Sequence, residues 1–140
     1  MYYEVKVRLD KTQENGFVKK VTETYLVDAV SFTEAEARMI KEITPFATGE
    51  FEIANIKKAR YAEIFFSGED SYYECRLEFI TLDEKTGTEK KTRQTVLAQA
   101  SDLKDAMARL SEAMKGTMAD YNAVSIKETN ILDVYKYEVQ

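Results

Sequence analysis

One long segment of this chain occurs twice, and the duplication constrains the fold more than any single motif does. Tyr2-Tyr3-Glu4 recurs as Tyr72-Tyr73-Glu74, and Ile56-Lys57 recurs as Ile126-Lys127, both at a shift of 70 residues. Between these blocks, after a one-residue insertion in the first loop, the identities run at a shift of 71: Gly16 with Gly87, Lys19-Lys20 with Lys90-Lys91, Leu26 with Leu97, and Arg38 with Arg109. Two copies of this length indicate a duplicated unit and not a solenoid of short repeats.

The repeats span residues 1–66 and 71–140, and the polar segment 67–70 links them. A unit of about 70 residues is marginal as an independent fold, because so small a chain buries too little apolar surface. The composition, with 44% hydrophobic and 32% charged residues, is that of a globular protein. We therefore expect residues 1–140 to form a single domain in which both repeats enclose one shared core.

Each repeat shows the same order of elements. Residues 2–9 alternate between apolar and polar side chains, which is typical of a strand buried on one face. Asn15-Gly16 is a turn pair, and the strand-like residues 17–27 complete a hairpin. Ser31 has capping-box spacing to Glu34 and begins a helix, which Pro45 ends near Thr44. The β-rich segment 51–66 is too long for one strand.

That long segment is predicted to break near Lys57-Lys58-Ala59, which gives two strands. The second repeat follows the same plan, with a turn at Thr86-Gly87, a helix that begins at Asp102, and a break near Thr129-Asn130. The sequence therefore predicts an α+β fold. It consists of a duplicated ββαβ(β) unit with a pseudo-twofold axis, in which two helices cover antiparallel-rich sheets.

The chain contains no histidine, which removes the commonest general base and the commonest transition-metal ligand. We expect no enzymatic activity and no cofactor. The net charge of −5 argues against nonspecific binding to nucleic acid or to an anionic membrane. A single cysteine, no recognisable signal peptide and no long apolar run predict a cytoplasmic protein that does not enter membranes.

Few residues are candidates for chemistry. Cys75 falls at an inward-facing strand position, equivalent to Val5, and is predicted to be a small buried hydrophobe and not a nucleophile. Glu63 and Asp133 occupy equivalent positions in the two repeats. A pseudo-twofold axis can bring them together as a Mg²⁺ site or an acid–base pair, although solvated carboxylates are the commoner case. An enzyme built on this pair is the third functional alternative.

Basic side chains alternate along the predicted strands and give the better functional signal. Lysines and arginines with tyrosines among them are typical of surfaces that bind single-stranded nucleic acid, where charge follows the backbone and rings stack on bases. Four glutamates dilute this face to a net charge of +2 over ten residues, and an ordinary solvated sheet face is the alternative. The candidate nucleic-acid-binding residues are Lys6, Arg8, Lys20, Arg76, Lys91, Arg93, Tyr2 and Tyr72.

Two resemblances to known families add to this interpretation. The blocks 2–7 (YYEVKV) and 56–65 (IKKARYAEIF) resemble a family of small uncharacterised proteins of bacteria and their phages, over nearly the whole chain. This resemblance implies a phage or mobile-element setting and transfers no site residues. From Phe51 onward, the order of four strands and a helix resembles the unit of whirly-type single-stranded DNA-binding proteins, circularly permuted. The lysine-glycine-lysine signature of that family is absent.

The leading functional hypothesis is a non-enzymatic binding or assembly module. It would act through a protein partner or by self-association, using its sheet edges or a sheet face. Single-stranded nucleic acid binding on the basic, tyrosine-bearing face is the alternative.

Overall fold

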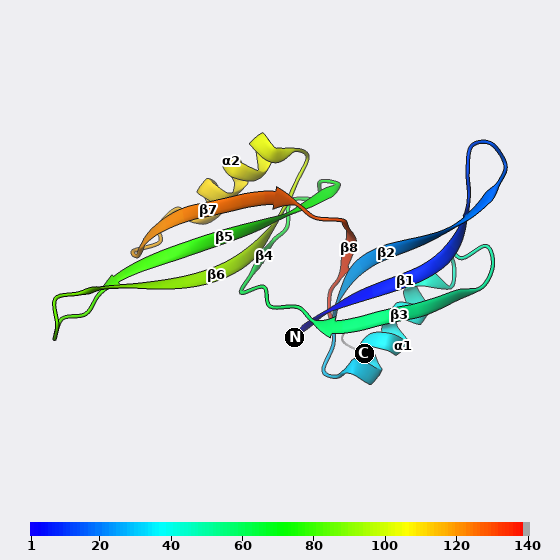
Figure 1. The fold of residues 1–140 in the computed structure, drawn as a ribbon, viewed down its shortest axis with the longest axis horizontal. Coiled ribbons are helices and arrows are strands. Elements are labelled where there is room, and N and C mark those ends of the chain that lie inside the picture. The colour runs from blue at the N-terminus through cyan, green and yellow to red at the C-terminus, as the bar shows by residue number, and fades with distance from the viewer. Residues whose placement is uncertain (139–140) are drawn as a thin grey trace. The chain divides into compact units, whose positions relative to one another are not determined.

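The computed structural model describes residues 1–138, which form two mixed four-stranded sheets and two helices (Figure 1). The predicted α+β class is confirmed. The two sheets have equivalent strand orders, β3-β1-β2-β8 and, read from the opposite edge, β7-β5-β6-β4.

The first sheet is built on a long hairpin. Strands β1 (Tyr2–Thr12) and β2 (Val18–Asp28) pair antiparallel, and β3 (Phe51–Lys58) pairs antiparallel with β1. Strand β8 (Ile131–Tyr135) adds to β2 in the parallel sense. The hairpin turns at the predicted Asn15-Gly16, where Gly16 adopts a φ of 84° that side chains with a Cβ disfavour.

The second sheet has the same plan. Strands β5 (Ser71–Leu82) and β6 (Glu89–Ala100) form the hairpin, and β7 (Asp120–Glu128) pairs antiparallel with β5. The two-residue strand β4 (Ile64–Phe65) pairs parallel with β6. The predicted breaks are confirmed, since β3 ends at Lys58 and β7 ends at Glu128.

The duplication extends to the irregularities of the sheets. The register between β1 and β3 shifts between Lys6 and Val7, and that between β5 and β7 shifts between Arg76 and Leu77, which are the equivalent positions. A β-bulge is specific to a position in a fold, so its repetition supports a common origin of the two halves.

The repeats exchange their last strands. Strand β4 follows β3 in the first repeat but pairs with β6 of the second, whereas β8 follows β7 in the second repeat but pairs with β2 of the first. The compact units therefore differ from the predicted repeats. We call Met1–Ala59 with Asn130–Gln140 unit 1, and Arg60–Thr129 unit 2. The single domain with one shared core, and the pseudo-twofold axis, stay predictions.

One helix covers one face of each sheet (Figure 1). Helix α1 (Phe32–Ile43) begins where Ser31 Oγ accepts a hydrogen bond from the Glu34 amide at 3.1 Å. Helix α2 (Leu103–Ala113) begins where Asp102 Oδ1 accepts one from the Asp105 amide at 2.7 Å. Both predicted caps are thus present, and each satisfies an amide that the first helical turn leaves unpaired.

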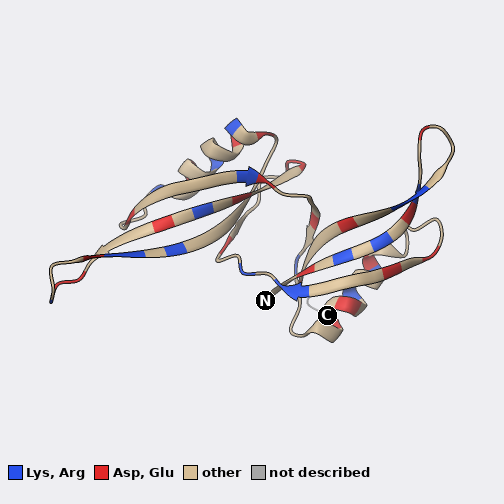
Figure 2. Cartoon of the chain, in the orientation of Figure 1, with Lys and Arg blue, Asp and Glu red and all other residues tan. Residues whose placement is uncertain are grey.

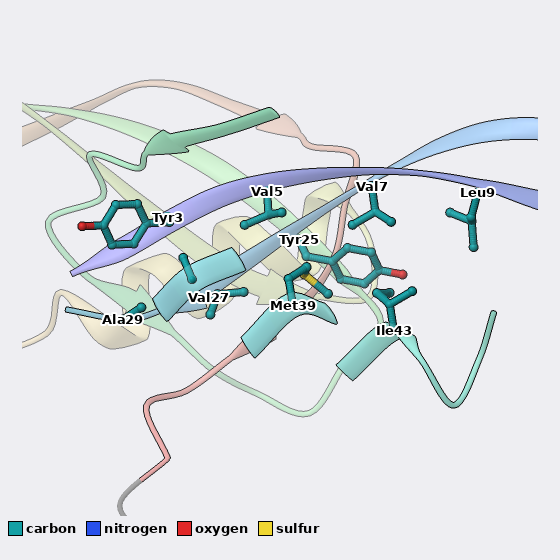
Figure 3. Close-up of a cluster of buried hydrophobic side chains, with 10 residues drawn as sticks. Tyr3, Val5, Val7, Leu9, Tyr25, Val27, Ala29, Met39 and Ile43 are labelled. Atoms are coloured by element: carbon teal, nitrogen blue, oxygen red, sulfur yellow. The ribbon is translucent and has the colours of Figure 1, made fainter. Parts of the chain in front are cut away.

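Each unit buries its own apolar cluster between helix and sheet. Figure 3 shows the cluster of unit 1, in which the inward side chains of β1 and β2 meet those of α1. Its buried members are Tyr3, Val5, Val7, Leu9, Tyr25, Val27, Ala29, Ala35, Met39 and Ile43. The corresponding residues of unit 2 are Tyr73, Cys75, Leu77, Val96, Ala98, Ala100, Ala106 and Leu110. Neither helix within residues 1–138 is long and apolar enough to cross a membrane.

Candidate functional site

The six cations predicted to share one basic face lie on two different sheets. Lys6, Arg8 and Lys20 are on β1 and β2 of unit 1, whereas Arg76, Lys91 and Arg93 are on β5 and β6 of unit 2. Lys6, Arg8 and Arg76 alternate with residues of the buried clusters. The hairpin registers put Lys20, Lys91 and Arg93 on the same faces, so all six occupy the faces opposite the helices. The prediction of a single six-residue face is therefore wrong. The alternation that suggested the face is present on each sheet, with three of the six cations on each.

Acidic side chains occur among the cations on both sheets, as the red and blue bands along β1 and β5 in Figure 2 show. In unit 1 two carboxylates on this face each pair with one cation. Arg8 Nη1 lies 2.6 Å from Glu52 Oε1 on β3, and Lys57 Nζ lies 3.0 Å from Glu4 Oε2. These cross-strand pairs reduce the positive potential that a phosphate backbone needs.

In unit 2 each carboxylate is shared between two cations. Glu74 Oε2 lies 3.8 Å from Arg76 Nη2 and 3.4 Å from Lys127 Nζ. Glu78 lies 3.9 Å from Lys91 Nζ and 3.6 Å from Arg93 Nε. The side chain of Glu74 is only 19% exposed, whereas those of Arg76 and Arg93 are 57% and 75% exposed. Within this group the cations outnumber the carboxylates.

A hollow of about 450 Å³ lies over this part of the second sheet. The polar groups around it come from all three antiparallel strands, and the exposed Val124 of the β7 bulge forms one side. The residues that line it are Glu74, Arg76, Leu77, Arg93, Gln94, Thr95, Val124 and Ser125. Thr95 and Ser125 were not singled out from the sequence. Counting strand residues outward from the Thr86-Gly87 turn would have placed Thr95 opposite Arg76. Nothing in the sequence indicates the β7 bulge beside Ser125.

The two tyrosines proposed to stack on bases are not equally available. Tyr72 is only 3% exposed, and its hydroxyl accepts a hydrogen bond from Gln99 Nε2 at 3.2 Å. Its ring is therefore not presented to a ligand, which corrects the prediction for this residue. Tyr2 is partly exposed, and burial, with a smaller effect of the Asp28 charge, raises the pKa of its hydroxyl.

Glu63 and Asp133 fall in different units, Glu63 just before β4 and Asp133 on β8. Both side chains are exposed, and Asp133 Oδ1 accepts a hydrogen bond from the Val134 amide at 2.8 Å. Among residues 1–138 no group of three or more acidic or cysteine side chains can hold a metal ion. The paired-carboxylate site stays a prediction.

Cys75 is fully buried in the cluster of unit 2, as predicted for a small hydrophobe. Burial, with a smaller contribution from the charge of Glu74, raises the pKa of its thiol to about 11. The thiol is therefore protonated at neutral pH, and a protonated thiol is a poor nucleophile.

Unit 1 contains a buried polar chain that we did not predict. Lys11 Nζ lies 2.9 Å from Glu23 Oε1, and the Tyr25 hydroxyl donates to Glu23 Oε2 at 2.8 Å. The ring of Tyr25 stacks on that of Tyr135 with centroids 5.8 Å apart, and the Arg38 guanidinium lies 5.9 Å from the Tyr135 centroid. Glu23 at an inward-facing position of β2 was the sequence signal for this chain.

The cations around the other large hollow, of about 520 Å³ beside α1, are committed to internal contacts. Arg38 Nε donates to Glu42 at 2.8 Å, and Arg38 Nη1 donates to the Lys136 carbonyl at 2.9 Å. Lys41 Nζ lies 2.9 Å from Glu138. These contacts fasten residues 136–138 to the helix, so this hollow has a structural explanation. The arginines at the hollow of unit 2 have longer ion pairs, at 3.8 Å for Arg76 and 3.6 Å for Arg93.

Comparison with known proteins identifies the family. The model of a domain of unknown function, DUF4494, matches residues 1–137. The chain belongs to the DUF4494 family. No curated protein matches the sequence, and no solved structure matches it. The family is thus one of uncharacterised proteins, as the sequence suggested, whereas the bacterial or phage origin and the likeness to whirly-type proteins stay predictions.

Proposed function

We propose that this DUF4494 chain is a non-enzymatic binding module and that its partner is a protein. The observation that supports the proposal most is the mixture of acidic and basic side chains on both helix-free sheet faces. Protein surfaces recognise one another through such mixed and complementary charge, whereas a nucleic acid backbone favours a continuous positive path. The burial of Tyr72 also removes a ring that base stacking would use.

The sheet edges favour the same function. Within residues 1–138, strands β3 and β7 each pair with one neighbouring strand, so the other edge of each presents a row of backbone amides and carbonyls without a strand partner. An extended segment of another protein can pair with such an edge. The mid-strand bulges of β3 and β7, and the lysines at their ends, hinder open-ended pairing and are consistent with selective binding. The buried free thiol of Cys75 suits the cytoplasmic setting that belongs to this proposal.

Selection from a displayed library of random peptides tests the proposal. The full chain is expected to enrich peptides whose binding is lost when both helix-free sheet faces are altered, by Arg8→Glu in unit 1 with Arg76→Glu in unit 2. The same chain is expected to give a flat titration with labelled oligo-dT at low salt. Salt-dependent oligo-dT binding, together with no peptide enrichment, would establish the nucleic-acid alternative instead. Light scattering over a concentration series distinguishes a second copy of the chain from a different partner.

A further inference from the structure

The hollow on the helix-free face of unit 2 contains a pair of arginines that make only long ion pairs with the rest of the protein. Arg76 and Arg93 lie on adjacent antiparallel strands, where Arg76 is opposite Thr95 and Arg93 is opposite Glu78. Their nearest carboxylate oxygens are 3.8 Å and 3.6 Å away, beyond the roughly 2.7–2.9 Å of a charge-assisted hydrogen bond. Among the described residues neither guanidinium donates a hydrogen bond to another side chain.

Other arginines of the chain behave differently. Arg38 donates to Glu42 at 2.8 Å, and Arg109 donates to Asp105 at 2.8 Å, with geometry that fixes the side chain. A guanidinium carries five donors in a rigid fork that matches a carboxylate. Two such groups above one hollow, with most of their donors unused, indicate a site for an anion.

The charges around the hollow agree with this. Glu74 and Glu78 are each shared by two cations, so four positive side chains surround two negative ones. Thr95 and Ser125 line the same hollow and add hydroxyl donors. These six side chains carry a net charge of +2, which one additional carboxylate would lower to +1.

We propose that the hollow binds an acidic peptide segment, with one carboxylate of the peptide between Arg76 and Arg93. This inference rests on the proposed protein-binding function and names the chemistry of the partner. Glu74 and Glu78 flank the arginines, so a strand with a charge on every phosphate would meet repulsion on both sides. Val124, half exposed on the edge strand β7, offers an apolar contact next to an edge that an extended segment can join.

The first repeat supplies the matched control. The residues equivalent to Arg76 and Arg93 are Lys6 and Thr22, and no hollow with two arginines occurs on that face within the described residues. Replacing the pair with the residues of the first repeat, Arg76→Lys with Arg93→Thr, removes the guanidinium fork. Because both side chains are exposed and on the surface of the sheet, this variant is expected to fold normally.

The test measures fluorescence anisotropy of the full chain with a labelled peptide that alternates Val and Glu. Binding is expected to weaken at least tenfold with a Val–Gln peptide, and at least tenfold in the Arg76→Lys/Arg93→Thr variant. A Lys6→Ala/Lys20→Ala control in unit 1 should bind like the unaltered chain. Equal binding of the two peptides, an unaffected arginine variant, or stronger binding of oligo-dT to the same site would overturn the inference. If library selection yields only non-acidic peptides, the proposed function stands and this inference falls.

Discussion

Unit 2 is one continuous stretch of chain, Arg60–Thr129, whereas unit 1 is assembled from Met1–Ala59 and Asn130–Gln140. Both build the same strand order around a hairpin, but with different connections. The parallel edge strand enters first in unit 2, as β4, and last in unit 1, as β8. The comparison shows that this sheet is specified by the buried faces of its strands and by their register. It does not depend on the order of the strands along the chain, and many domains likewise tolerate circular permutation.

The two interiors also differ. Unit 1 places Glu23, Tyr25 and Tyr135 where unit 2 has Gln94, Val96 and Phe65. Glu23 is buried and hydrogen-bonded, while Gln94 is exposed. The same architecture therefore tolerates a satisfied polar chain in one copy and an apolar cluster with Cys75 in the other.

The largest effect is expected from truncating the chain after Thr129, which removes β8. Ile131 and Val134 are buried, and each contributes about 1.5–3 kcal/mol by removing its side chain from water. Unit 1 should lose its protection against amide hydrogen exchange, while the continuous unit 2 keeps its own. The variant Leu132→Ala, at an exposed position of β8, is the control and should change little. Equal loss of protection in both units would contradict the comparison.

Mutations of equivalent core residues give the next test of the comparison between the two units. Met39 and Leu110 occupy matching helical positions and are both buried. Met39→Ala and Leu110→Ala should each lower the free energy of unfolding by about 2–5 kcal/mol, because each leaves a cavity in a packed cluster. Hydrogen exchange should report faster local opening only in the unit that carries the change. If Leu110→Ala opened unit 1 as much as unit 2, the units would not be separately packed.

The polar chain of unit 1 is tested by Glu23→Ala. The change leaves the Tyr25 hydroxyl without its acceptor, which should cost about 1–3 kcal/mol in denaturant unfolding. Gln94→Ala at the equivalent exposed position of unit 2 should cost close to nothing. Adding Tyr25→Phe to Glu23→Ala should recover part of the loss, since the orphaned hydroxyl is then gone. No recovery would mean that Glu23 acts through something other than this hydrogen bond.

The smallest effect at neutral pH comes from Cys75, whose thiol pKa is raised from 9.0 to about 11 by burial. A group with a raised pKa contributes stability that is complete below its unfolded pKa and is lost as pH rises through the folded one. Stability should therefore decline between about pH 9 and pH 11 as the unfolded thiol ionises. In Cys75→Val, which carries the residue of the first repeat, urea unfolding should show a weaker decline over this range. An unchanged pH profile would remove Cys75 as its cause.

Much of each unit was predictable because local rules govern it. Alternation located the buried faces, the Asn15-Gly16 and Thr86-Gly87 turns located the hairpins, and Ser31 and Asp102 located the helix starts. The strand exchange was not predictable. Leu26 and Leu97 are identical, so β2 and β6 offer a short parallel strand nearly the same partner in either repeat. No local sequence pattern shows whether β4 and β8 pair with the hairpin of their own repeat or with that of the other repeat.

The candidate site was predictable in part for the same reason. Alternation placed Arg76 and Arg93 on an outward face, and the hairpin register implied their neighbours across the strands. The bulge at Val124, which shapes the hollow, depends on how β7 meets β5 over a long separation in sequence. The burial of Tyr72 likewise depends on tertiary contacts. The alternation of residues along its strand placed the Tyr72 ring on the outward face, but the ring is buried.

The exchange of the last strands is tested most directly by nuclear Overhauser effects between backbone protons of the full chain. The account predicts cross-peaks between Val27 and Tyr135 and between Ala98 and Phe65, which are the paired residues of β2 with β8 and of β6 with β4. Cross-peaks between Val27 and Phe65 and between Ala98 and Tyr135 would show instead that each repeat keeps its own strand, and would contradict it.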